Sequence, residues 1–197
     1  MNPPPGSGAL RPRRGGRARR PSAPGRGGAP RATSSRGEGT AGPEAPDIAR
    51  FFLADRFART SGVRLEEVRP GYARARLSVR ERHLNAVDVA QGGAIFTLAD
   101  LAFAACSNSH GTVAVAVNAN IQFVRAGRRG SLWAEAREVA LSPKLSSVEV
   151  RVTDRGGEAV AFLTGLAYRR KDTLLEAAAS RKAAARRRGP RRARRGP

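Results

Sequence analysis

The chain has 197 residues and a formal net charge of +21, with 37 Lys and Arg against 16 Asp and Glu and a single cysteine. One cysteine excludes an intramolecular disulfide and a cysteine-based zinc site. No apolar run approaches membrane-spanning length, and the charged N-terminus is not followed by the apolar segment of a secretory signal. We therefore expect a cytoplasmic protein with no membrane partner.

The excess charge lies mostly at the two ends of the chain. Residues 1–44 are rich in Gly, Pro and Arg and carry +7, residues 173–197 carry +8, and the middle keeps +6. Neither end holds enough apolar residues to offset the entropy cost of ordering. The composition predicts two disordered basic tails, 1–44 and 173–197, around one folded domain over residues 45–172.

Arginine-rich tails can bind nucleic acid non-specifically. A nucleic-acid-associated protein acting through its basic tails is therefore one alternative function. No aromatic residue is interleaved with the tail arginines, which removes the base stacking of single-strand binding. We expect at most non-specific binding through the tails.

The domain begins with a predicted helix and a predicted hairpin. Apolar residues at helical spacing from Ile48 to Phe57 predict an amphipathic helix that ends near Arg59. Residues 63–68 and 72–79 flank a turn containing Pro70 and Gly71, which predicts a hairpin. A polar loop over residues 80–91 follows.

The next segment, residues 94–108, is apolar almost all round and carries one charge, that of Asp100. Such a pattern predicts a buried helix. A buried carboxylate is costly unless it is paired, neutralised or needed for function. Directly before the helix, Gly92 and Gly93 leave backbone N–H groups accessible at the positive end of the helix dipole. A carboxylate so close to a backbone anion site indicates acyl chemistry.

Four predicted strands complete the domain, over residues 112–124, 131–141, 145–153 and 158–170. Their connections are too short for parallel neighbours, so the strands must pair antiparallel. The element order predicts an α+β fold in which an antiparallel sheet wraps around one central buried helix.

Several stretches of this domain together match a known family. They are HLN over 83–85, QGGAIFTLAD over 91–100, AFA over 102–104 and IQFVR over 121–125. The pattern resembles the hotdog-fold acyl-CoA thioesterases, and within them the PaaI-like (phenylacetate-degradation) subgroup. The resemblance extends over about residues 47–170 and implies a hotdog fold for the domain.

The resemblance also implies roles for three residues. Asp100 matches the catalytic carboxylate, which acts as nucleophile or as general base for water. The Gly92 N–H matches the donor that polarises the thioester carbonyl, and Asn85 matches the residue that positions the water or the thioester. The family's active sites form across a dimer interface, with Gly92 and Asp100 of one site from different subunits. The resemblance thus implies a homodimer or homotetramer that acts on an acyl-CoA substrate without a cofactor.

Two departures from the family pattern bear on activity. The usual His before the glycine pair is Gln91, which can donate a hydrogen bond but cannot titrate. The Asn-Gly-His opening is Asn85-Ala86-Val87, and the Arg-Pro turn is Arg125-Ala126. A non-catalytic acyl-CoA-binding hotdog protein therefore stands as a second alternative, although the retained Asp100 favours hydrolysis of aryl- or medium-chain acyl-CoA.

Each of these residues also has a structural interpretation. Asp100 can be a core carboxylate satisfied by its surroundings, the glycine pair a tight helix entry, and Asn85 a turn cap. We favour the functional interpretation for these three. Gln91 fits both interpretations, either lining the site or shaping the loop.

Further substrate-binding candidates are Gly93 at the helix start, Asn118 and Asn120 on one strand face, and Arg125 and Arg128 at a turn. Arginine suits the phosphates of coenzyme A. Solvated surface is the alternative for both the asparagine face and the arginine turn. The two histidines have no third ligand beside them, so no metal site is expected. Cys106 is expected to be a small core residue.

Overall fold

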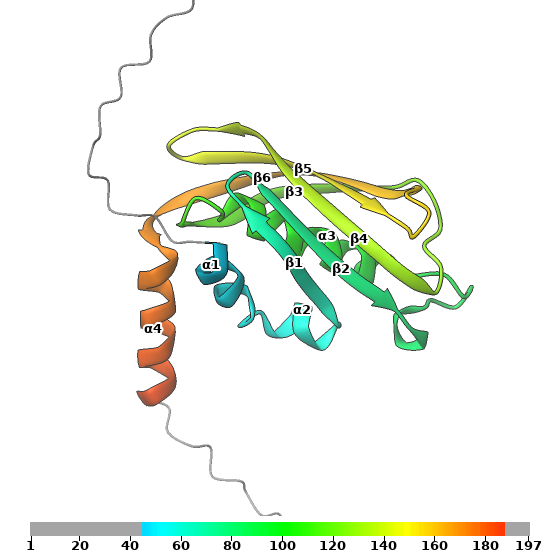
Figure 1. Ribbon diagram of the computed structural model, residues 1–197, viewed down its shortest axis with the longest axis horizontal. Helices are drawn as coiled ribbons and strands as arrows, with labels where there is room; N and C mark the ends of the chain where they lie inside the picture. The colour runs from blue at the N-terminus through cyan, green and yellow to red at the C-terminus, as the bar shows by residue number, and fades with distance from the viewer. Residues whose placement is uncertain (1–44, 188–197) are drawn as a thin grey trace, which may run out of the picture. The chain divides into compact units, whose positions relative to one another are not determined.

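The computed structural model describes residues 45–187, and its elements are shown in Figure 1. In chain order they are α1 (Ala45–Phe52), α2 (Arg56–Thr60), β1 (Val63–Arg69), β2 (Tyr72–Val79), α3 (Gly92–Ser107), β3 (Thr112–Phe123), β4 (Gly130–Leu141), β5 (Leu145–Thr153), β6 (Ala159–Thr173) and α4 (Leu174–Arg187). A short 3-10 turn, Glu81–His83, opens the loop between β2 and α3.

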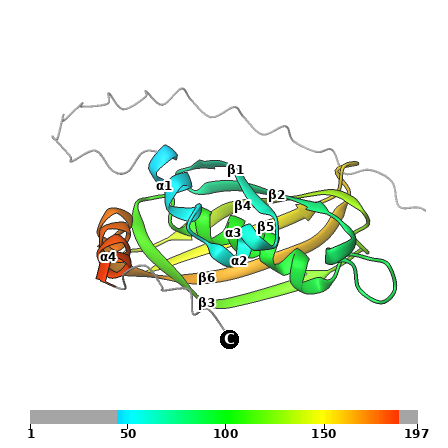
Figure 2. The same ribbon diagram turned by 90° about the horizontal axis from the view of Figure 1, so that it is seen from below.

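The six strands form one antiparallel sheet in the order β1-β2-β4-β5-β6-β3. Consecutive strands pair through short turns, except that the chain crosses to the far edge through α3 and β3 before it returns along β4. Figure 2 shows β1 and β3 on opposite sides of α3, with the sheet curving around the helix. The predicted antiparallel sheet around one central helix is confirmed.

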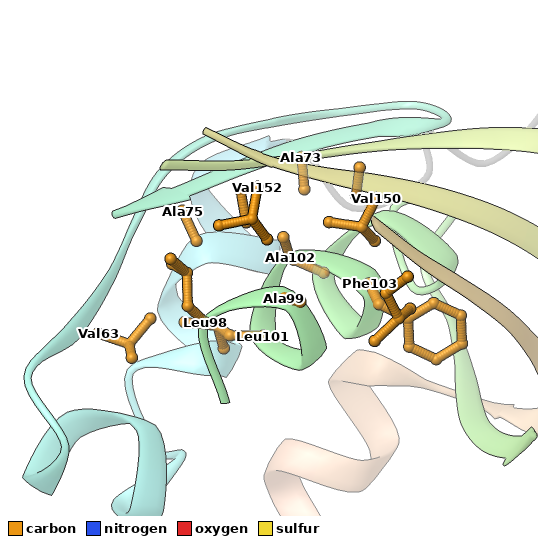
Figure 3. Close-up of a cluster of buried hydrophobic side chains, with 14 of the residues drawn as sticks. Val63, Ala73, Ala75, Leu98, Ala99, Leu101, Ala102, Phe103, Val150 and Val152 are labelled. Carbon is orange, nitrogen blue, oxygen red and sulfur yellow. The ribbon is translucent and has the colours of Figure 1, made fainter. Parts of the chain in front are cut away.

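The core forms where α3 packs on the concave face of the sheet. Leu98, Ala99, Ala102 and Phe103 of α3 are at most 1% exposed, and they lie against small and β-branched side chains of the sheet (Figure 3). Contact is closest at Gly165 of β6, where an added Cβ would lie 2.5 Å from a ring carbon of Phe103. The absence of a side chain there lets the phenylalanine ring fill the space between helix and sheet.

The strand β3 occupies one edge of the sheet. It pairs with β6 on one side, and no strand of the described chain pairs with its other side. Val115 and Val117 on this strand are 50% and 60% exposed. An apolar edge strand of this length is a surface that natural proteins usually cover.

The predicted helix over residues 48–59 is two helices in the structure. The break falls at Asp55, whose carboxylate accepts a hydrogen bond from the Ala58 N–H at 2.9 Å and so forms the N-cap of α2. Apolar spacing continues across this break, which is why the periodicity alone predicted one element.

The prediction of a disordered tail from residue 173 is wrong for residues 173–187, because Thr173 ends β6 and residues 174–187 form α4. Thr173 and Glu176 cap this helix reciprocally, through hydrogen bonds of 2.7 to 3.2 Å. Leu174 is 3% exposed, and the Arg181 guanidinium lies 5.3 Å from the centre of the Phe51 ring. The segment has few large apolar residues, but it is rich in Ala, Leu, Arg and Lys, which are strong helix formers. The rest of the predicted tails, 1–44 and 188–197, lies outside the described residues.

Within residues 45–187, none of the helices is both long enough and apolar enough to span a bilayer.

Candidate active site

The N-terminus of α3 presents a free backbone donor. Gln91 is the N-cap of the helix, and its side-chain oxygen accepts a hydrogen bond from the Gly93 N–H. This cap starts the helix at Gly92, ahead of the predicted Ala94. No acceptor in the described chain bonds the Gly92 N–H, which is left at the positive end of the helix dipole.

A cavity of about 450 Å³ adjoins this donor. Val89, Ala90, Gly92, Ile95 and Phe123 line it together with the turn that follows β3. The Phe123 ring faces Gly92 so closely that a Cβ at this position would lie 3.3 Å from the ring. Glycine therefore leaves the backbone amide open to a group that enters beside an apolar wall, which is the arrangement that favours binding of a carbonyl oxygen.

Asp100 lies on the side of α3 that faces away from the sheet. Its side chain is partly buried, and no residue in the described part of the chain forms a hydrogen bond or ion pair with it. Burial, and secondarily the negative charge of Asp55, raise the pKa of the Asp100 carboxyl. The structural interpretation requires amides or a buried arginine that bond the Asp100 carboxylate. Residues 45–187 provide no such partner.

The Gly92 N–H and the Asp100 carboxylate are far apart within one chain. Gly92 is the first residue of α3, and Asp100 stands two turns further along it. At 1.5 Å per residue this separation is about 12 Å along the helix axis. One thioester group therefore cannot have its carbonyl oxygen at the Gly92 N–H and its carbonyl carbon at the Asp100 carboxylate of the same chain.

Asn85 organises the loop that leads to α3. Its Oδ1 accepts hydrogen bonds from the N–H groups of Val87, at 3.0 Å, and Val89, at 3.3 Å. Asp88 completes the turn in a left-handed conformation, with φ of 59°. The amide nitrogen of Asn85 has no acceptor within residues 45–187, so the same side chain holds the loop and keeps a donor for another group.

The candidate asparagines of β3 are both exposed. Asn118 pairs in register with Leu166, and Asn120 pairs with Thr164. Neither residue lines the cavity beside Gly92. The structure therefore places them on the edge strand, outside the Gly92 cavity.

The candidate arginines lie beside the Gly92 cavity. Arg125 lines both that cavity and a neighbouring groove of about 730 Å³, to which Arg128 and Arg129 also contribute. Arg125 forms an ion pair with Glu158, and Arg129 pairs with Glu81 at 3.1 Å. No acidic side chain of the described chain pairs with Arg128, and the basic groove shares Arg125 with the Gly92 cavity.

Neither histidine belongs to this site. His83 is buried, and its Nδ1 accepts from the Arg80 N–H at 3.0 Å while Nε2 lies 3.0 Å from the Ser61 carbonyl oxygen. Burial and the neighbouring Arg82 lower the pKa of His83, which keeps it neutral. No three metal-ligating side chains converge in residues 45–187. Burial raises the pKa of Cys106 to about 12, so its thiol is not a nucleophile.

Two features near α3 escaped the sequence analysis. At the far end of the helix, His110 Nε2 lies 2.7 Å from a Glu138 oxygen, and the Ser146 hydroxyl donates to the other oxygen at 2.6 Å. These residues come from three separate segments, and no spacing in the sequence links them. The second feature is Asp55 beside Asp100, which only the pattern of an N-cap before Ala58 could have indicated.

The chain is similar to several known proteins. The model of the thioesterase superfamily matches residues 89–161. An Archaeoglobus fulgidus protein named "Putative esterase" is 40% identical over 120 residues, which cover 60% of this chain and 78% of that protein. The acyl-coenzyme A thioesterase PaaI of Escherichia coli is 30% identical over 121 residues, or 61% of this chain and 86% of its own.

Solved structures agree with these matches. The structure of Escherichia coli PaaI, from the phenylacetic acid degradation operon, superimposes with a TM-score of 0.63 over 65% of this chain and 94% of that chain, at 28% identity. A Streptococcus mutans protein solved with bound acetyl-CoA gives a TM-score of 0.52 over 54% of this chain and 86% of its own, also at 28% identity. With the fold, the glycine pair and the helical carboxylate, these matches show that the chain belongs to the thioesterase superfamily, as a PaaI-like hotdog enzyme that hydrolyses thioesters.

Proposed function

We propose that the protein hydrolyses aryl- or medium-chain acyl-CoA thioesters to the free acid and coenzyme A. The observation that carries this proposal is the pair of unsatisfied groups on α3, the Gly92 N–H and the partly buried Asp100 carboxylate. Neither group has a partner within residues 45–187, so both are available to bind a ligand.

The thioester carbonyl oxygen accepts a hydrogen bond from the Gly92 N–H, which stabilises the negative charge that develops as the carbonyl carbon becomes tetrahedral. A donor of this kind lowers the barrier by about 3–4 kcal/mol. Asp100 either removes a proton from the attacking water and passes it to the leaving thiolate, or attacks the carbon directly to form an acyl anhydride that water then hydrolyses to the free acid. The Asn85 amide group orients that water, and the C–S bond then breaks to release the coenzyme A thiol.

The reaction requires a second copy of the chain. Because Gly92 and Asp100 of one chain are about 12 Å apart along the helix, a site that uses both must take one from each of two chains. The uncovered edge of β3, with Val115 and Val117 exposed, supports a dimer that pairs along this strand. In such a dimer, Asn118 and Asn120 of the same strand are candidates for contact with the substrate.

Coenzyme A carries several phosphate charges, and the basic groove beside Gly92 suits them. We assign Arg125 and Arg128 to this contact, because Arg125 adjoins the Gly92 cavity and Arg128 is unpaired among residues 45–187. Gln91, which replaces the family's histidine, keeps the helix start in place through its hydrogen bond to the Gly93 N–H.

The proposal is tested by a hydrolysis screen of the full chain against benzoyl-, hydroxyphenylacetyl- and straight-chain acyl-CoAs. Release of free coenzyme A from at least one of these supports it. Tight binding of an acyl-CoA without release would instead favour the non-catalytic alternative.

A further inference from the structure

A second cavity, of about 510 Å³, lies between α1, α2, β1 and the side of α3 next to Asp100. Its apolar lining is formed by Phe52, Leu53, Ala58, Val63, Leu65 and Leu101. We name it the α1–α2 pocket. Its volume falls within the range of small-molecule sites, and mostly apolar walls with a few polar groups are typical of such sites.

The pocket has a closed floor and an open mouth. Ala58, Val63 and Leu101 are 3%, 5% and 4% exposed, so they form the floor against the core. Val63 and Leu101 appear in Figure 3 on the side of α3 that is nearest to β1. Leu53 is 70% exposed, which places an apolar side chain in solvent at the mouth. Charged side chains of Arg50, Asp55, Arg59 and Arg64 complete the exposed rim. A buried apolar floor under such a rim suits a narrow chain or a ring better than a flat protein surface.

The pocket is next to the reacting carboxylate. Leu101 follows Asp100 in the helix, and Asp55, which also lines the pocket, lies close enough to Asp100 for its charge to be felt there. Asp100 itself does not line the pocket, but its neighbour Leu101 does, so a substrate whose carbonyl carbon is at Asp100 has an apolar cavity one residue away along α3. Among the apolar cavities described in residues 45–187, only the α1–α2 pocket is lined by a residue whose charge raises the pKa of Asp100.

We propose that the α1–α2 pocket holds the acyl group of the thioester, with Leu53 and Ala58 setting the size of acyl group that is accepted. The inference rests on the proposed function, because it assigns the acyl end of the same substrate. The thioester carbonyl stays at Asp100, while the ring or chain beyond it enters between α2 and Leu101. Each methylene that the pocket removes from water raises kcat/KM by about fourfold.

The test measures kcat/KM of the full chain for acetyl-, octanoyl- and phenylacetyl-CoA. Leu53→Asp places a charge at the mouth from an exposed position, so folding is not at risk. It should lower kcat/KM for octanoyl- and phenylacetyl-CoA by at least about tenfold and leave acetyl-CoA within about twofold. Ala58→Leu fills the floor and should shift the preference to shorter acyl groups.

The matched control is Leu175→Asp, which changes a leucine on α4 that is 58% exposed and does not line the pocket. It should leave the ratio of octanoyl-CoA to acetyl-CoA unchanged. Unchanged ratios in both pocket variants would overturn the inference and leave the proposed function standing. An equal loss for all substrates together with a changed oligomeric state would mean that a second copy fills the pocket, which also overturns it. A wild-type chain that hydrolyses none of the three would remove the proposed function and this assignment together.

Discussion

Gly92 and Asp100 lie on one helix but two turns apart, so the free N–H at the start of α3 and the unpaired carboxylate at its middle cannot meet on one thioester within a single chain. Under the proposed mechanism, the sequence motif that contains both residues supplies one half of each of two sites.

Replacement of the carboxylate by its amide tests the role of Asp100. Asp100→Asn should reduce kcat by at least about a hundredfold, because the amide can neither attack the carbonyl nor accept a proton from water. The measurement is release of coenzyme A from the best acyl-CoA substrate. The control is Asp172→Asn, since Asp172 is a partly buried carboxylate paired with Arg170 at 2.8 Å and lies outside the site. Near-wild-type turnover in Asp100→Asn would refute the mechanism.

The same variant should be more stable than the wild type at neutral pH. The raised pKa of Asp100 means that the folded state holds its proton more tightly than the unfolded chain does. Stability therefore falls as the pH rises through this pKa, and the neutral asparagine avoids that loss. Thermal unfolding should show a higher Tm for Asp100→Asn at pH 7 and a smaller difference in acid. A lower Tm at pH 7 would show that the carboxylate has stabilising partners.

The backbone donor can be deleted without deleting the helix. Gly92 is the first residue of α3, where proline is well tolerated, and Gln91 before it has φ of −63° and ψ of 136°, which proline also permits. Gly92→Pro removes the N–H and should lower kcat by about 10²- to 10³-fold. Gly92→Ala introduces the same Cβ beside Phe123 but keeps the N–H, so it should retain most of the activity. Equal losses in the two variants would mean that crowding, and not the donor, is responsible.

The acid limb of the pH profile should report Asp100. Hydrolysis needs the carboxylate, so kcat/KM falls as the pH drops through its raised pKa. Asp55→Asn removes the nearby negative charge and keeps the cap of α2, because asparagine is an equally good N-cap. The limb should move to lower pH in this variant and stay in place in Asp172→Asn. A limb that does not move, or moves upward, contradicts the coupling between Asp55 and Asp100.

In the C-terminal helix α4, we expect Leu174 to contribute to the free energy of unfolding and Leu175 to contribute little. Leu174 is 3% exposed and Leu175 is 58% exposed, although they are neighbours at the start of α4. Leu174→Ala should lower the free energy of unfolding by about 2 kcal/mol. Leu175→Ala should change it by less than about 0.5 kcal/mol. Denaturant titration of both variants measures the difference, and similar values for the two would mean that α4 is not packed as described.

Much of the fold followed from local patterns in the sequence. Turn residues and short connections predicted the strands and their antiparallel pairing, and one apolar segment around Asp100 predicted the central helix. Gly92 and Asp100 were found as a pair because they belong to one continuous motif. Their unsatisfied hydrogen-bonding groups could be established only from the structure.

Other features depend on contacts that no local pattern contains. The cap at Asp55 divides a helix whose apolar spacing is continuous, and α4 forms from helix propensity where apolar content is low. The α1–α2 pocket joins residues from two short helices, a strand and α3. The hydrogen-bonded group of His110, Glu138 and Ser146 depends on the register of β4 with β5 and on where α3 ends.

The most direct test of the central claim mixes two inactive chains. Gly92→Pro and Asp100→Asn chains with different affinity tags are co-expressed, and dimers that carry both tags are isolated and assayed. One site of such a dimer combines an intact Gly92 with an intact Asp100, so activity should return to about half of the wild-type value per dimer. Mixed dimers as inactive as the two parents would contradict a site shared between subunits.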